Sequence, residues 1–134
     1  MLTVVYDSKT GLGKKFAKKL PYPRQKVKKE LEGPCLLVTR NEGLGEVPKK
    51  TKKFLKKYST QVQGVVVNGN KKYGKYFCGS GDRINKKYGL PILRKMEGEG
   101  DAEDVKAVLA ALRDLGFEAP AEQPQAPRQR QIKQ

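Results

Sequence analysis

Histidine is absent from this sequence, and cysteine occurs only twice. Cys35 and Cys78 lie far apart, and neither belongs to a CxxC pair. A Cys/His metal centre and a histidine-based catalytic triad are therefore excluded, and we expect no metal site. Cys35 lies in the apolar run PCLLVT, which is typical of a small buried hydrophobic side chain. Cys78 lies at a loop-to-helix junction, which leaves its role open.

Long apolar stretches are also missing. No run approaches the roughly 20 apolar residues that a membrane-spanning helix needs. The charged N-terminus lacks the apolar core of a secretory signal. We therefore expect a cytoplasmic protein that makes no membrane contact and keeps its thiols reduced.

Acidic residues are scarce in residues 1–95, which hold 24 basic and 6 acidic side chains, a net charge of +18. The whole chain carries +15. Such a field attracts phosphates, anionic cofactors, nucleic acid or an acidic protein face, and it does not by itself choose among them. A lysine-rich, solvated surface is the alternative explanation.

Apolar runs that are present alternate with amphipathic segments, as in an α/β fold. Compact β-branched runs predict strands at 2–6, 34–39, 63–67 and 90–96, and a weaker charged segment predicts an edge strand at 25–29. Helical spacing appears at 13–20, 47–58, 80–88 and 101–116. Strands that alternate with helices predict a parallel sheet covered on both faces.

The last helix carries the clearest boundary signals. Asp101 can cap its start, Asp104 occupies the capping-box position, and Gly116 follows its end. With 134 residues the chain suits one domain, which we place at 1–117. The remaining segment, 118–134, contains three prolines and five glutamines with few apolar residues, so we expect a disordered tail.

Three unusual loops should meet at one edge of this sheet, beyond the carboxyl ends of the strands, where ligands bind in open α/β sheets. The first, DSKTGLG at 7–13, combines hydroxyls and glycines with the start of a helix, which suits a phosphate. It matches neither GxxxxGK[ST] nor GxGxxG, and a plain strand-to-helix turn is the alternative.

The other two loops suit a flat ring. Residues 39–48 contain two glycines separated by one residue, so their backbone can lie against a planar group, although a generic turn has the same composition. Residues 68–82 offer asparagine amides and the aromatic faces of Tyr73 and Tyr76. A phosphate loop, a glycine loop and an amide-plus-aromatic loop together favour flavin mononucleotide (FMN).

Several of these stretches resemble the NrdI family, the small flavodoxin-like activators of class Ib ribonucleotide reductase. The matching segments are DSKTG (7–11), LVT through the glycine loop to VP (37–48), GVVVNGNKKYG (64–74), SGD (80–82) and LPIL (90–93). The resemblance implies a flavodoxin-like three-layer sandwich with a five-stranded parallel sheet in the order 2-1-3-4-5. It also implies FMN as the cofactor.

In this family, reduced flavin reacts with dioxygen, and the superoxide formed helps to assemble the dimanganese-tyrosyl radical of the reductase small subunit. The resemblance implies that Ser8, Thr10 and Gly11 hold the phosphate, that 41–45 borders flavin N5, and that 68–70 meets the pyrimidine edge. Tyr73 stands where relatives often have a stacking tryptophan. The full predicted cofactor-binding set is Ser8, Lys9, Thr10, Gly11, Leu12, Gly13, Thr39, Arg40, Asn41, Glu42, Gly43, Leu44, Gly45, Asn68, Gly69, Asn70, Tyr73, Gly74 and Phe77.

Leu12 and Phe77 differ from the other members of this cofactor-binding set. Leu12 replaces a small polar residue common in relatives, which leaves the backbone amides to carry more of the phosphate contact. Phe77 also fits the hydrophobic core. We predict no catalytic side chain, since the flavin itself would react.

Three functions compete at this point: an FMN-dependent reductase activator with a separate flavin-reducing partner, a general electron-transfer flavodoxin, and a basic nucleic-acid-binding module. The third is disfavoured because the lysines are spread over several predicted helices. A further hypothesis is that Lys9, Arg40, Lys71, Lys72 and Lys75 form a positive rim that stabilises anionic reduced FMN.

Overall fold

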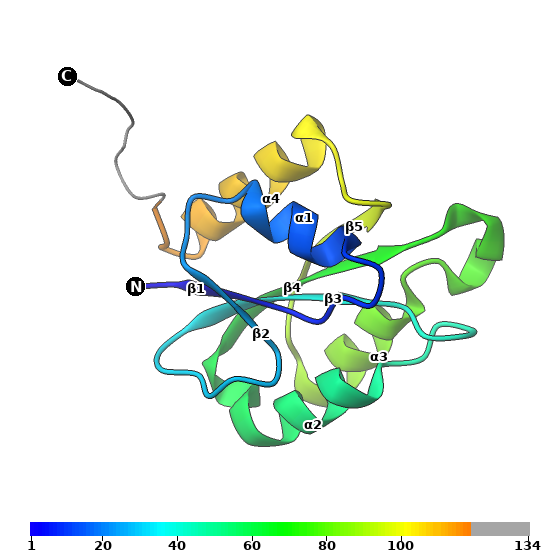
Figure 1. Cartoon of the computed structure of the whole chain (residues 1–134), viewed down its shortest axis with the longest axis horizontal. Coiled ribbons are helices and arrows are strands. Elements are labelled where there is room, and N and C mark those ends of the chain that lie inside the picture. The colour runs from blue at the N-terminus through cyan, green and yellow to red at the C-terminus, as the bar shows by residue number, and fades with distance from the viewer. Residues whose placement is uncertain (119–134) are drawn as a thin grey trace.

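Five parallel strands form one sheet in the computed structural model, which describes residues 1–118 (Figure 1). The strand order is β2-β1-β3-β4-β5, which confirms the order implied by the resemblance. The strands are β1 (Thr3–Tyr6), β2 (Arg24–Lys26), β3 (Cys35–Arg40), β4 (Val62–Gly69) and β5 (Ile92–Glu97). The predicted tail, apart from Glu118, lies outside the described residues.

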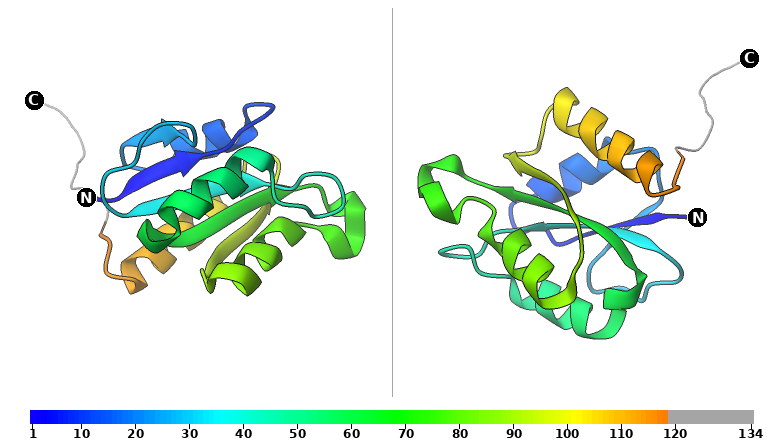
Figure 2. Two further views of the ribbon diagram at one scale, coloured as in Figure 1. Left: turned by 90° about the horizontal axis from the view of Figure 1, so that it is seen from below. Right: turned by 180° about the vertical axis from the view of Figure 1, so that it is seen from behind.

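Helices cover both faces of the sheet, as predicted. Figures 1 and 2 show α1 (Leu12–Lys18) and α4 (Ala102–Asp114) on one face, with α2 (Lys49–Tyr58) and α3 (Gly79–Tyr88) on the other. Two short 3-10 helices, η1 (Ser59–Gln61) and η2 (Lys71–Tyr76), flank β4. The architecture is a three-layer α/β sandwich.

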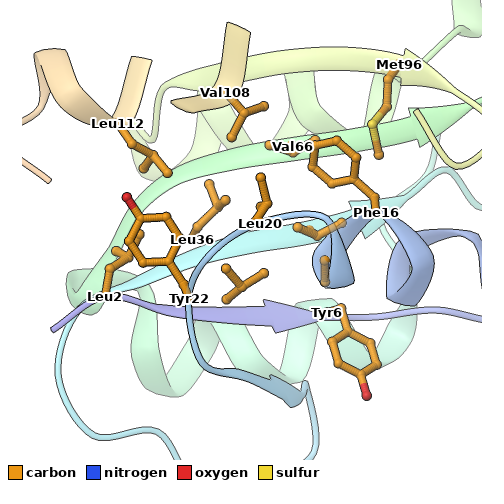
Figure 3. Packing of buried hydrophobic residues seen from close by; sticks show 13 residues of the cluster. Leu2, Tyr6, Phe16, Leu20, Tyr22, Leu36, Val66, Met96, Val108 and Leu112 are labelled. Carbon is orange, nitrogen blue, oxygen red and sulfur yellow. The ribbon is translucent and has the colours of Figure 1, made fainter. Parts of the chain in front are cut away.

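Successive side chains of the central strands point alternately into two separate hydrophobic cores. Leu36 and Val66 point to the α1/α4 face, where they meet Phe16, Met96 and Val108 (Figure 3). The opposite side chains of β3 and β4 pack against Phe54, Leu55 and Ile84 from α2 and α3. The sheet is therefore buried on both faces, which explains why its strands read as continuous apolar runs.

The edge strand differs from its predicted range of 25–29. It pairs with β1 only from Arg24 to Lys26, and the chain then turns, with Lys29 N–H donating to the carbonyl of Lys26. This turn lets Val27 bury its side chain beneath the α2 face. Val27 N–H still donates to the carbonyl of Tyr6 on β1 at 2.9 Å, while its side chain joins the core.

The start of α4 agrees with its predicted capping box. The side chain of Asp101 accepts from the backbone N–H of Asp104, and the Asp104 carboxylate accepts from the backbone N–H of Asp101. Asp104 also accepts from Arg94 Nε on β5 at 2.7 Å. The helix is therefore fixed both at its own terminus and to the sheet.

The same carboxylate should make stability depend on pH in the acidic range. Partial burial alone would raise the pKa of Asp104, but hydrogen bonds from Arg94 and Asp101 outweigh it and lower the pKa. Its stabilising contribution is present above the unfolded-state pKa and is lost as pH falls through the folded-state pKa. We expect Asp104→Ala to cost about 1–2 kcal/mol at neutral pH. In urea unfolding, this difference should shrink at strongly acidic pH, and a pH-independent difference would contradict the assignment.

Both cysteines are fully buried, which confirms the expectation for Cys35 and settles the position of Cys78. Burial raises the pKa of the Cys35 thiol to about 12 and that of Cys78 to about 11. The Cys78 thiol donates to the carbonyl of Val67 at 3.3 Å. Both thiols are therefore shielded and protonated at neutral pH.

We accordingly expect both thiols to resist alkylation in the native protein. Titration with a chromogenic disulfide reagent should show two thiols only after denaturation, because thiolate is the reactive form. Rapid reaction of either thiol in the folded protein would contradict the burial seen here.

Two further observations concern residues 1–118. No helix within residues 1–118 combines the length and apolarity needed to cross a membrane. No cluster of three or more potential metal ligands occurs among these residues either.

Candidate functional site

A cavity of about 580 Å³ opens at the carboxyl ends of β1, β3, β4 and β5. The three loops predicted to meet at one sheet edge do meet there. Its volume lies within the usual range for cofactor pockets, and its place beside the β1/β3 junction is where doubly wound sheets bind ligands. The lining residues are Asp7, Ser8, Lys9, Thr10, Leu12, Gly13, Arg40, Asn41, Glu42, Gly43, Asn68, Gly69, Asn70, Tyr73, Glu97 and Gly98.

The first loop presents a buried hydroxyl to this cavity. Ser8 Oγ is shielded from solvent and has no hydrogen-bond partner within residues 1–118. Gly11, in the left-handed conformation, precedes α1, and no described side chain caps that helix. A buried unpaired hydroxyl beside uncapped helix amides is an arrangement that an anion would satisfy.

Beneath this loop lies a buried polar chain that starts at Asp7. Thr51 Oγ1 donates to Asp7 Oδ2 at 2.7 Å, and the hydroxyls of Thr51 and Thr39 lie 2.7 Å apart. All three side chains are buried. The chain fastens the end of β1 to α2 and to the end of β3, so it fixes the position of the first loop.

Arg40 lies between two carboxylates at the mouth of the second loop. Its Nη1 donates to Glu42 Oε2 at 2.8 Å, and its Nε lies 3.9 Å from Asp7 Oδ1. The hydrogen bond from Arg40 lowers the pKa of Glu42. Arg40 Nε itself is buried and has no hydrogen-bond partner among the described residues.

The second loop is a tight hairpin. Glu42 and Glu46 exchange two backbone hydrogen bonds of 2.8 and 2.7 Å, and Leu44 at the tip is 56% exposed. Gly45 has a φ of +81°, and a Cβ there would lie 3.3 Å from the Cα of Gly79. The hairpin base and the start of α3 therefore approach closely enough to require glycine.

Asn41 joins the second loop to the third. Its Nδ2 donates to the carbonyl of Tyr76 at 2.7 Å, and its Oδ1 accepts from the backbone N–H of Ser80 at 2.9 Å. Ser80 Oγ in turn donates to the carbonyl of Arg40 at 3.1 Å. These bonds connect the end of β3 to η2 and to the start of α3.

The third loop supplies amides and an aromatic ring. Asn68 donates to the carbonyl of Gly98 at 3.2 Å, whereas the Asn70 side chain accepts from the backbone N–H of Lys72 and caps η2. Tyr73 is 46% exposed at the cavity edge, with Lys72 Nζ 5.6 Å from its ring centroid. An exposed aromatic ring beside a polar cavity suits stacking on a planar ligand.

Charged groups of both signs line the cavity, contrary to the simple picture of a positive rim. Lys9 and Arg40 are opposed by Asp7, Glu42 and Glu97. Lys71, Lys72 and Lys75 stand outside the lining, over aromatic rings of η2 and Phe77. The positive charge of residues 1–95 is therefore not concentrated in the cavity.

A family model described as "NrdI Flavodoxin like" matches residues 4–110, which include all three loops and every strand residue except Thr3. The chain belongs to the NrdI flavodoxin-like family. The match includes the whole cavity lining.

Curated NrdI proteins align over most of the chain. Protein NrdI of Bacillus licheniformis is 42% identical over 109 residues, which are 79% of this chain and 83% of that protein. Protein NrdI of Macrococcus caseolyticus is 34% identical over 78% of this chain and 84% of its own length. Both alignments thus cover more than four fifths of the NrdI relative.

Solved flavodoxins share the fold of this NrdI-family chain. Flavodoxin 2 from Bacillus cereus superposes with a TM-score of 0.60 at 17% identity, covering 87% of this chain and 99% of the flavodoxin. A Fusobacterium nucleatum flavodoxin bound to flavin mononucleotide superposes with a TM-score of 0.56 at 19% identity, covering 86% and 96%. At such identities the likeness establishes the fold.

The structure brings most of the predicted cofactor-binding set to the cavity of this NrdI-family chain. Six members do not line it: Gly11, Thr39, Leu44, Gly45, Gly74 and Phe77. Thr39 is fully buried in the polar chain below, Leu44 lies at the hairpin tip, and Phe77 packs against the α2/α3 core. Gly11 instead lines an adjoining hollow beside the first loop.

Three lining residues lie outside the predicted set: Asp7, Glu97 and Gly98. Asp7 is the first residue of the predicted phosphate loop at 7–13, and its place at a strand end was a usable signal. Glu97 and Gly98 follow β5, whose C-terminal turn showed no motif in the sequence. Their presence follows from the pairing of β5 with β4.

Proposed function

We propose that this protein binds FMN in the cavity and serves as the oxidant-supplying partner of a class Ib ribonucleotide reductase small subunit. The proposal rests on membership of the NrdI flavodoxin-like family, together with one observation that carries it. The buried, unpaired Ser8 hydroxyl lies in a cavity built from three loops at the β1/β3 junction.

The described residues fit the parts of FMN. Ser8, Thr10 and the amides at the start of α1 would hold the phosphate, with Lys9 and Arg40 adding positive charge. The segments 41–43 and 68–70 would border the ring, and Tyr73 would stack on it. The opposing carboxylates of Glu42 and Glu97 lie at the cavity wall, where they would limit the total positive charge around the cofactor.

Reduced FMN held by these residues would supply the electron that converts dioxygen to superoxide, the oxidant proposed for dimanganese-tyrosyl radical assembly on the small subunit. The chain itself binds and orients the cofactor. The Asn41 bridge holds the ring-side loops together, and the buried Asp7–Thr51–Thr39 chain holds the phosphate-side loop in place.

The direct test is cofactor content. The purified protein should be yellow, and acid-released flavin should co-migrate with FMN on chromatography rather than with riboflavin or FAD. Protein prepared without flavin should take up FMN with a stoichiometry near one. A colourless protein that fails to bind added FMN would refute the proposal.

A general electron-transfer flavodoxin is the second candidate, favoured by the shared fold. Activity separates the two. The reduced protein with dioxygen should generate tyrosyl radical in a manganese-loaded class Ib small subunit, measured by electron paramagnetic resonance. An FMN-loaded protein that reduces unrelated acceptors but leaves the subunit inactive would favour the flavodoxin.

Ser8→Ala should weaken FMN binding selectively. Removal of a hydroxyl that contacts a charged phosphate should cost about tenfold in affinity. Riboflavin, which lacks the phosphate, should bind the variant and the wild type equally. Thr60→Ala, in η1 at the far end of β4, is a control that should leave both affinities unchanged. Equal losses for FMN and riboflavin would argue against the phosphate assignment.

A further inference from the structure

A second hollow, rich in lysine, lies beside the predicted phosphate loop. This hollow of about 370 Å³ adjoins the outer side of this loop and shares Asp7, Ser8 and Lys9 with the cofactor cavity. Its other lining residues include Lys14 of α1, Lys26 of β2, Lys28 and Lys50 of α2. Five lysines therefore surround this hollow, and Asp7 is its one acidic residue.

This hollow continues along α2. A neighbouring groove of about 510 Å³ shares Val27, Lys28 and Lys50 with it and adds Lys29, Lys53 and Lys57, with Glu30 as its one carboxylate. The two hollows therefore adjoin each other between α2 and the segment of β2 and the residues after it. We call the pair the basic furrow and define it by Lys9, Lys14, Lys26 and 28–29 with Lys50, Lys53 and Lys57.

The lysines of the basic furrow lack partners of opposite charge. Ion pairs of the described residues involve Lys15, Lys19, Arg40, Arg94 and Lys95, and none involves a furrow lysine. Asp7 is buried and turned toward Thr51. Eight lysines thus line the furrow without an ion pair to any acidic residue within residues 1–118, and Asp7 and Glu30 are the only carboxylates of the lining. The excess positive charge favours an external anion.

We propose that the basic furrow is a docking site for an acidic segment or face of a partner protein, held beside the phosphate end of the cofactor cavity. Such a surface accelerates encounter with a negative partner and orients it. Lys9 is shared with the cofactor cavity, but the other seven furrow lysines lie outside its lining. Docking to these seven does not depend on the function proposed above.

The side chains of the furrow favour protein over nucleic acid. All eight cationic residues are lysines, which are compact, strongly hydrated charges, whereas phosphate recognition favours the bidentate guanidinium of arginine. The aromatic ring at the end of the furrow, Tyr58, packs on Phe54 at a centroid distance of 5.1 Å. That ring is therefore engaged with the core rather than free for base stacking.

The test uses the full chain labelled with nitrogen-15 and two probes of matched charge, a decaglutamate peptide and a single-stranded decanucleotide. The peptide should shift the amide resonances of 26–30 and 49–58 at near-physiological salt. A furrow variant carrying Lys28→Gln, Lys50→Gln and Lys53→Gln should bind the peptide about tenfold more weakly. A control variant with Lys18→Gln, Lys86→Gln and Lys106→Gln has the same net charge, and its affinity should change less than about twofold.

Three results would overturn the proposal. Peptide-induced shifts scattered over the whole surface, or equal losses in the two variants, would make the furrow a solvated surface. Tighter binding of the decanucleotide than of the peptide to the same residues would make it a nucleic-acid site. Mapping on the wild-type chain needs no variant, and FMN binding measured in parallel tests the proposed function independently.

Discussion

Asn41→Ala is expected to lower the unfolding free energy by about 2 kcal/mol and to weaken flavin binding about tenfold. The Asn41 side chain is the bridge between the second and third loops, donating to the carbonyl of Tyr76 and accepting from Ser80 N–H. Alanine leaves both backbone groups without that partner in a partly buried position. The two loops then lose their fixed spacing, and the free energy needed to restore it on binding lowers the affinity for flavin.

Asn70→Ala is the matched control for this variant. Asn70 also lines the cavity, but its side chain accepts only from Lys72 N–H inside its own loop. Its loss should cost less than about 1 kcal/mol. Urea unfolding and quenching of flavin fluorescence measure the two effects. Equal stability losses for both asparagine variants would show that the bridge between the loops is unimportant.

Gly100→Ala is expected to destabilise the protein by about 3 kcal/mol, because it combines a strained backbone with an overfilled core. Gly100 has a φ of +76°, and a Cβ there would lie 2.7 Å from Phe16 Cδ1 and 2.8 Å from Met96 Sδ. Phe16 is fully buried between the sheet and its helices, so its ring cannot move aside freely (Figure 3). Thermal unfolding should show a correspondingly lower midpoint.

Gly89→Ala separates the cost of backbone strain from the cost of an overfilled core. Gly89 has a similar φ of +71°, but a Cβ there meets nothing within 4 Å. It should cost only the backbone strain, about 1 kcal/mol. Gly100→Ala should destabilise the Phe16→Leu variant by less than it destabilises the wild type, because part of the steric overlap is then removed. If the two glycine variants were equally stable, the steric part of the explanation would be wrong.

The predictable part of this fold came from local signals. Continuous apolar runs at β3 and β4 predicted strands buried on both faces, and Asp101 with Asp104 predicted the start of α4 correctly. The five-stranded order came from the family resemblance, because strand order depends on long-range pairing that no local pattern contains. The predicted range of β2, 25–29, was wrong because the chain turns after Lys26. Val27 is a typical strand residue, but its side chain packs beneath α2.

The candidate site was predictable to the extent that it consists of loops following strands. Ser8, Asn41 and Asn68 could be placed at one edge from the parallel topology alone. The contacts among them could not, since the bridge from Asn41 to Tyr76 and Ser80 joins residues far apart in sequence. The carboxylates of Asp7 and Glu97 were not predicted at the site, because hydroxyls, glycines and positive charge are the features typical of a phosphate site. Their inclusion changes the expected electrostatics of the cavity from positive to mixed.

The short edge strand β2 also bears on how the chain behaves at high concentration. An open sheet edge can recruit a strand from a second molecule and so start fibril growth. Here that edge offers only Arg24, Gln25 and Lys26 for pairing, and the lysines at 28–29 follow directly. A second copy would bring the same positive charges to the same place. Lys26 and the lysines at 28–29, which belong to the basic furrow, thus also oppose the addition of a strand along the β2 edge of the sheet.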